Sequence, residues 1–164
     1  MRWKTTVLLL AVTVGIGAYI SLYELRQPTP EEREQLAKEV VSLPRESVTQ
    51  LILDLPAVKA TVTHDGTAWR LAPGGVRAYE ELVNGVLRHT NPLRAERVLT
   101  ASAEHPLDLK ASGLDPPVGR ITLLSRGATT TLLIGETTAV NDNRYLQVEG
   151  RPEVFIVPGG VFDD

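Results

Sequence analysis

An uncharged run near the start of the chain constrains the possible folds more than any other stretch. From Thr5 to Tyr23 the residues are apolar except for scattered Thr, Ser and Tyr. At a rise of about 1.5 Å per residue, roughly 19 helical residues reach about 28 Å, close to the thickness of the hydrocarbon core of a bilayer. The run therefore predicts a transmembrane helix, with Trp3 and Tyr23 at the two membrane surfaces.

The charges that flank this run predict its orientation. Arg2 and Lys4 precede it, whereas the glutamates of residues 31–34 follow it. Because the basic flank stays in the cytoplasm, we expect an inner-membrane protein with a cytoplasmic amino terminus and a periplasmic carboxyl-terminal domain. A cleaved signal peptide is the alternative, but the run is longer than the apolar core of a typical signal peptide. The absence of Cys excludes a lipid anchor on cysteine, disulfides and thiolate metal sites.

Small side chains recur along one face of the expected anchor. Thr13, Gly17 and Ser21 are four residues apart, so on a helix they form a nearly continuous strip. Such strips let two helices approach closely in lipid. We therefore expect these three residues to be the partner-binding face, in contact with transmembrane helices of a larger complex.

Composition predicts one ordinary globular domain beyond this helix. The 164 residues carry a net charge of -3, and 43% of them are hydrophobic. Lys and Arg are scattered through the sequence instead of clustering, which argues against nucleic acid as a partner. We therefore expect a transmembrane anchor over residues 1–25, a connector with a short helix over 26–46 and one extracytoplasmic α+β domain over 47–164.

Local patterns predict the first elements of this domain. Thr29-Pro30-Glu31-Glu32 has the form of a capping box and predicts a helix over about residues 30–41. Apolar residues alternate over 47–55, 58–63 and 69–71, and Asp65-Gly66 between the last two runs predicts a β-hairpin. An amphipathic helix is expected next, because apolar residues recur at spacings of three and four; they are Tyr79, Leu82, Val83, Val86 and Leu87.

The remaining sequence predicts further strands. Residues 93–99 are expected to form one strand, and a helical turn near 106–111 is expected to end at Gly113 in a left-handed conformation. From Arg120 to Val157, alternating runs separated by turns predict a meander. The expected fold class is α+β: a single N-terminal transmembrane helix followed by a small, mostly antiparallel β domain with one amphipathic helix packed on the sheet.

No constellation of residues predicts catalysis. The three histidines, His64, His89 and His105, have no partner at metal-ligand spacing. Residues 141–143, with the sequence Asn-Asp-Asn, offer oxygen ligands for Ca²⁺ together with Glu136, but a single acid among amides is more typical of a plain turn. We therefore expect no enzymatic activity, no catalytic or metal-binding residue and no cofactor.

Several short motifs follow one another in a fixed order. They are Ala68-Trp69-Arg70-Leu71, residues 93–99, Gly113-Leu114-Asp115-Pro116-Pro117, Leu133-Ile134-Gly135-Glu136, Arg144-Tyr145 and residues 154–157. With these motifs the chain resembles the bacterial family catalogued as domain of unknown function 4340, and the Gly-Leu-Asp-Pro-Pro element is the most specific of them. The resemblance implies an extracytoplasmic accessory role, because some members resemble auxiliary components of gliding-motility ABC transporters. It supplies no catalytic residues.

Two functions are compatible with these features. The first is a non-catalytic, single-pass accessory or scaffold subunit that docks on and stabilises a larger bacterial membrane complex for transport, secretion or energy conversion, such as a photosynthetic complex. Its partners would be the lipid bilayer and the transmembrane helices and outer surface of that complex. The alternative is a membrane-anchored extracytoplasmic module that delivers a peptide, glycan or lipid to an ABC-type transporter. Such a module would use a sheet edge or a groove under the helix near residues 78–88.

Overall fold

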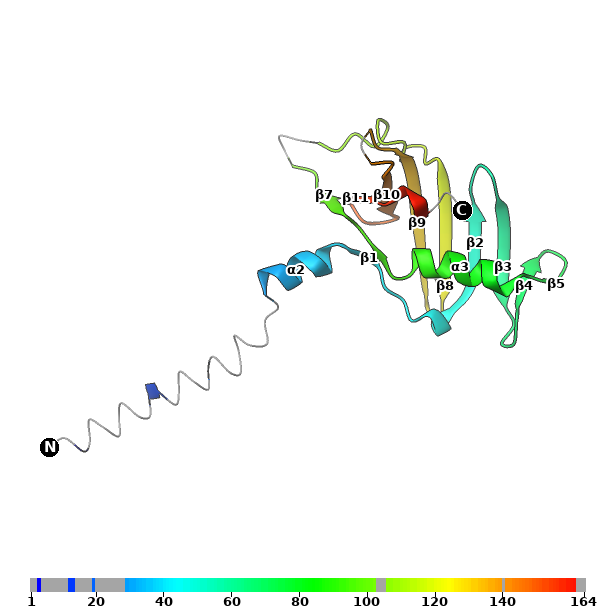
Figure 1. Ribbon diagram of the computed structural model, residues 1–164, viewed down its shortest axis with the longest axis horizontal. Coiled ribbons are helices and arrows are strands. Elements are labelled where there is room, and N and C mark those ends of the chain that lie inside the picture. The colour runs from blue at the N-terminus through cyan, green and yellow to red at the C-terminus, as the bar shows by residue number, and fades with distance from the viewer. Residues whose placement is uncertain are drawn as a thin grey trace. The chain divides into compact units, whose positions relative to one another are not determined.

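The computed structural model describes Trp3, Val12, Thr13, Tyr19 and residues 29–102, 106–139 and 141–161 (Figure 1). Its contacts divide the chain into two compact units, Met1–Leu36 and Ala37–Asp164. We describe each unit by itself.

The helix α2, Pro30–Ala37, belongs to the first unit except for its last residue. Its start is a reciprocal cap, because the Thr29 N–H donates to Glu32 Oε2 at 2.7 Å and the Glu32 N–H donates to Thr29 Oγ1 at 3.2 Å. The predicted capping box is therefore confirmed. The helix is shorter than predicted, since the β-branched Val40 and Val41 belong to a strand and are buried in the core of the second unit.

The predicted membrane span is not supported by the structure. Crossing a bilayer takes about 20 consecutive apolar helical residues, whereas α2 has 8 residues and α3, Glu80–Thr90, has 11. No helix in the described part of the chain is long and apolar enough to cross a membrane. The expected fold class is therefore wrong in its transmembrane element. The single-pass topology, the inner-membrane location, the cytoplasmic amino terminus and the periplasmic domain, which all rested on that element, are withdrawn with it.

The run from Thr5 to Tyr23 itself lies almost wholly outside the described residues. Val12, Thr13 and Tyr19 are described from it, and each is helical with an exposed side chain. The signal-peptide alternative concerns the same run and also lies outside what the structure describes.

The second unit is built on one antiparallel sheet, which has nine strands among the described residues (Figure 1). The strand order is β5-β4-β3-β2-β8-β9-β10-β11-β7. The strands are β2 Val48–Asp54, β3 Lys59–His64, β4 Trp69–Ala72, β5 Val76–Arg77, β7 Arg97–Leu99, β8 Gly119–Ser125, β9 Ala128–Thr137, β10 Arg144–Val148 and β11 Val154–Val157. The hairpin at Asp65-Gly66 and the carboxyl-terminal meander are thus confirmed.

The predicted strand over residues 93–99 is divided between two sheets. β6, Leu93–Arg94, pairs with β1, Glu39–Val41, in a separate two-stranded sheet, whereas β7 pairs with β11. Between them, the Ala95 N–H donates to Lys38 O and the Glu96 N–H donates to Ile156 O, each at 2.8 Å. The chain therefore leaves the two-stranded sheet after Ala95 and joins the large sheet from Glu96 onward.

The helix α3, Glu80–Thr90, covers one face of the large sheet (Figure 1). Val83 and Leu87 are buried in the core, but Tyr79 and Leu82 are 65% and 68% exposed. The buried stripe is therefore narrower than the sequence predicted. The fully buried aliphatic side chains of the sheet are Leu51, Ile121, Leu123, Leu132, Ile134, Leu146, Val154 and Val157.

A turn over residues 112–117 lies directly on β9. The Glu136 N–H donates to Ser112 O and the Val118 N–H donates to Ile134 O, both at 2.9 Å. Gly113 has a φ of 66°, which confirms the predicted left-handed end of the helical turn. A Cβ at Gly135 would collide with the Ser112 carbonyl oxygen, so glycine is required there for the close approach of the two segments.

Candidate functional site

Four exposed apolar side chains lie, as two pairs, on three consecutive elements at one edge of the large sheet. They are Leu71 of β4, Val76 of β5, Tyr79 at the start of α3 and Leu82 in its first turn. Leu71 and Val76 are cross-strand partners, and Tyr79 and Leu82 are three residues apart on one side of the helix. We call these four residues the edge patch. Adjacent exposed apolar side chains of this kind mark interaction surfaces more often than isolated ones do.

The edge patch continues the core outward along a row of side chains that crosses five strands. The row consists of Leu123, Leu51, Val62, Leu71 and Val76, each paired with the next in register. The first three are buried, whereas Leu71 is 42% and Val76 is 67% exposed. The row thus carries apolar side chains beyond the part of the sheet that is buried.

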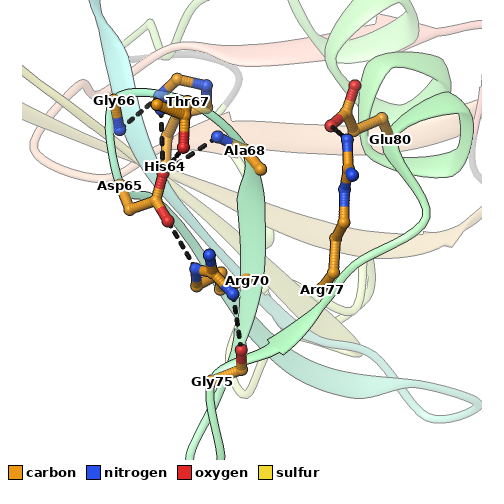
Figure 2. A network of polar contacts seen from close by, with 9 residues as sticks. All are labelled: His64, Asp65, Gly66, Thr67, Ala68, Arg70, Gly75, Arg77 and Glu80. Carbon is orange, nitrogen blue, oxygen red and sulfur yellow. Dashed lines mark hydrogen bonds and ion pairs between the residues drawn. The ribbon is translucent and has the colours of Figure 1, made fainter.

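Polar contacts fix the turns that support the edge patch (Figure 2). Asp65 Oδ1 accepts from the Thr67 hydroxyl at 2.7 Å and from the N–H groups of Thr67 and Ala68 at 2.9 Å each. Arg70 Nε donates to Asp65 Oδ2, and Arg70 Nη1 donates to Gly75 O at 3.1 Å. Arg70 therefore ties the β3–β4 turn to the β4–β5 turn and holds β5 in place.

These contacts also determine how two of the groups titrate. The Thr67 hydroxyl, then the Arg70 guanidinium and the nearby N–H groups, stabilise the carboxylate and hold the pKa of Asp65 well below its usual range. On β5, Arg77 donates to Glu80 Oε1 at 2.7 Å, and this hydrogen bond raises the pKa of Arg77. Asp65 is thus an anchored anion within the turn.

Asp65→Asn should remove a pH-dependent part of the stability. Because the folded-state pKa is lowered, the carboxylate stabilises the fold above about pH 4, and this contribution is lost as the pH falls through the lowered value. The melting temperature of the variant should lie below that of the parent at pH 7, and the two should converge toward about pH 2. Thermal unfolding followed by circular dichroism across this range measures the difference.

Asp54→Asn is the matched control for this prediction. Asp54 is also on the sheet surface, and within the described ranges its ion pair is with the exposed Lys59, at 2.9 Å. Exposed pairs of this kind contribute little, so its curve should follow the parent closely. If the melting temperature of Asp65→Asn stays below that of the parent by the same amount from pH 7 to pH 2, the stabilisation does not depend on ionisation of Asp65, and the prediction is wrong.

The residues that the sequence singled out as the partner-binding face, Thr13, Gly17 and Ser21, belong to the first unit, and their role stays a prediction. Thr13 is helical and exposed, whereas Gly17 and Ser21 lie outside the described residues. Sequence reasoning missed the edge patch. The sequence contained one indication of it, the width of the apolar stripe on α3. The helix buries mainly Val83 and Leu87, so a stripe that also includes Tyr79 and Leu82 leaves apolar side chains exposed.

The predicted candidate for Ca²⁺, residues 141–143, forms a left-handed turn beside a cavity of about 490 Å³. The buried Asn143 amide donates to Glu96 Oε2 at 2.6 Å, so its nitrogen already serves a contact within the protein. Over the described ranges, no group of three His, Asp or Glu side chains is placed to hold a metal ion. His64 and His89 lie on β3 and α3, and His105 lies outside those ranges.

A family model described as domain of unknown function (DUF4340) matches residues 69–164, more than half of the chain. The matched part begins at β4 and includes α3, the turn on β9 and the whole meander. No curated protein and no solved structure matches the chain.

Proposed function

The chain belongs to the family described as domain of unknown function DUF4340, and we propose that it acts as a non-catalytic accessory or scaffold subunit that docks on a larger protein complex. The edge patch is the observation that carries this proposal. Its four side chains are supplied by three consecutive elements within the part of the chain that the family model matches. Docking of a partner would remove this apolar surface from water.

The surroundings of the edge patch suit an apolar partner surface. Arg77 pairs with Glu80, Arg70 pairs with Asp65, and the Tyr79 hydroxyl donates to Glu81 Oε2 at 3.1 Å. The charges of Arg70 and Arg77 are therefore matched within this chain, whereas the Glu81 carboxylate keeps its negative charge, because a hydroxyl donor does not neutralise it. Interfaces commonly combine an apolar centre with a polar rim, and here the rim is polar and carries one acidic group.

Contacts between side chains are favoured over strand addition at this edge. β5 has two residues and carries Arg77, and short, charged edge strands disfavour pairing with another chain. Two residues also offer few backbone hydrogen bonds. We therefore assign the docking to the apolar side chains of the edge patch.

The double variant Val76→Glu, Leu82→Glu should abolish docking. Both side chains are exposed, so the substitutions should leave the fold intact while placing two charges at the centre of the interface. We expect co-purification of the partner to fall at least about tenfold, because central interface residues commonly contribute more than about 1 kcal/mol each. The measurement is affinity purification of the tagged full chain from its native host, with partner stoichiometry determined by mass spectrometry.

Val58→Glu is the control for this experiment. Val58 is 48% exposed in the β2–β3 turn and is not part of the edge patch. This variant should retain the partner at the parent level. Purification of the parent without any stoichiometric partner, or equal retention by the double variant, would refute the proposed docking.

A further inference from the structure

A second site lies on the same sheet face, beside the carboxyl-terminal half of α3. A cavity of about 400 Å³ is bordered by α3, the β3–β4 hairpin and the short 3-10 helix η2, Arg45–Ser47. Its polar lining consists of Arg45, Glu46, His64, Asn84 and Arg88, and Trp69 also lines it. None of the edge-patch residues takes part. The volume is within the range of about 300–1,000 Å³ that is usual for small-molecule sites.

The charged groups of this lining are two guanidinium groups and one carboxylate. Arg45 Nε donates to Asn91 O at 3.3 Å, which fixes the guanidinium while its two terminal nitrogens remain as further donors. The Arg88 side chain makes no hydrogen bond or ion pair with any residue between 29 and 102, 106 and 139 or 141 and 161. With Glu46 as the acid, the lining has an excess of positive charge, whereas the chain as a whole has a net charge of -3.

The aromatic part of the lining is rigid. Trp69 is only 6% exposed, and the His64 ring meets it edge-on with the ring centres 5.1 Å apart. The Gly66 N–H donates to His64 Nδ1 at 3.2 Å, which fixes the orientation of the imidazole ring. The cavity thus combines a preorganised apolar surface with donors from three separate elements.

We propose that this cavity binds a small ligand that carries an oxyanion group, a carboxylate or a phosphate. Guanidinium groups bind such groups through paired N–H donors, and two of them converge here from η2 and α3. Arg88 is the principal contact because its donors are not engaged within the described protein, and Arg45 is the second. The body of the ligand lies against Trp69. The site is independent of the edge patch and adds a ligand to the proposed docking function.

Titration of the full chain with inorganic phosphate and with benzoate tests the proposal and distinguishes the two sources of the oxyanion. Trp3→Phe leaves Trp69 as the single tryptophan, so its fluorescence reports on this cavity. We expect saturable binding of at least one probe. Arg88→Gln should weaken it about tenfold or more, because hydrogen bonds to charged groups are the strong ones. Glu46→Gln should strengthen it several-fold by removing the opposing charge.

Arg120→Gln is the matched control, since Arg120 is an exposed arginine of β8 outside the cavity lining. It should bind both probes as the parent does. A role of Arg88 restricted to the carbonyl end of α3 would instead lower the melting temperature of Arg88→Gln without changing the affinity for either probe. That result would overturn the proposal, as would the absence of saturable binding to the parent up to about 10 mM, the weak end of ordinary affinities.

Discussion

Asn91→Ala should lower the free energy of unfolding by about 3 kcal/mol, because it leaves two partly buried backbone groups without partners at about 1–3 kcal/mol each. The Asn91 side chain is fully buried at the end of α3. Its Oδ1 accepts from the Leu43 N–H and its Nδ2 donates to Leu43 O, each at 2.7 Å. Urea denaturation of parent and variant measures the loss as a shift of the unfolding midpoint.

Asn84→Ala is the control for this change. Asn84 is exposed on α3, and alanine has the higher helix propensity, so stability should stay within about 0.5 kcal/mol of the parent or rise slightly. If Asn91→Ala lowers the free energy of unfolding by less than about 1 kcal/mol, other groups must form hydrogen bonds with the backbone N–H and C=O of Leu43 in the variant.

The elements that the sequence predicted correctly are those determined by nearby residues. The hairpin at Asp65-Gly66 and the helix that begins after Tyr79 follow from turn chemistry and periodicity within a dozen residues. The order of the strands in the large sheet does not follow from such local patterns. β2 pairs with β8 through contacts such as Leu51 with Leu123, and no local pattern indicates which of several apolar strands will be neighbours.

The candidate sites were harder to predict for two different reasons. Tyr79 and Leu82 satisfy the helical period, so they were assigned to the core. Their exposure becomes visible only when the sheet beneath the helix is seen to end at β5. Arg45, His64 and Arg88 are far apart in the sequence, and each alone is an ordinary surface residue. Their convergence on one cavity depends on where η2 and α3 lie in the fold.

The apolar run at the start of the chain led to a different kind of error. Its length and lack of charge predicted a spanning helix from composition alone. The helices α2 and α3 have 8 and 11 residues, and no helix in the described part of the chain is long and apolar enough to cross a membrane. The family match and both candidate sites lie in the second unit.

Gly135→Ala should destabilise the fold by about 2–3 kcal/mol, the cost of overpacking a closely packed site. Glycine is the weakest strand former, so alanine in β9 would stabilise the strand if the space were open. It is not open, because the new Cβ would meet the Ser112 carbonyl oxygen and would lie 3.0 Å from the Tyr145 Cβ. The turn that contains Gly113 would have to lift from β9, breaking the hydrogen bond from the Glu136 N–H to Ser112 O.

Gly85→Ala separates this close contact from the general effect of replacing glycine. Nothing lies within 4 Å of a Cβ built at Gly85, which is inside α3. Alanine should therefore stabilise the helix by about 1 kcal/mol. If urea denaturation shows a loss of stability for Gly135→Ala and a gain for Gly85→Ala, then the Gly-Leu-Asp-Pro-Pro element is packed closely on β9. Equal stability of Gly135→Ala and the parent would contradict this, because it would mean that the turn is not seated on the strand.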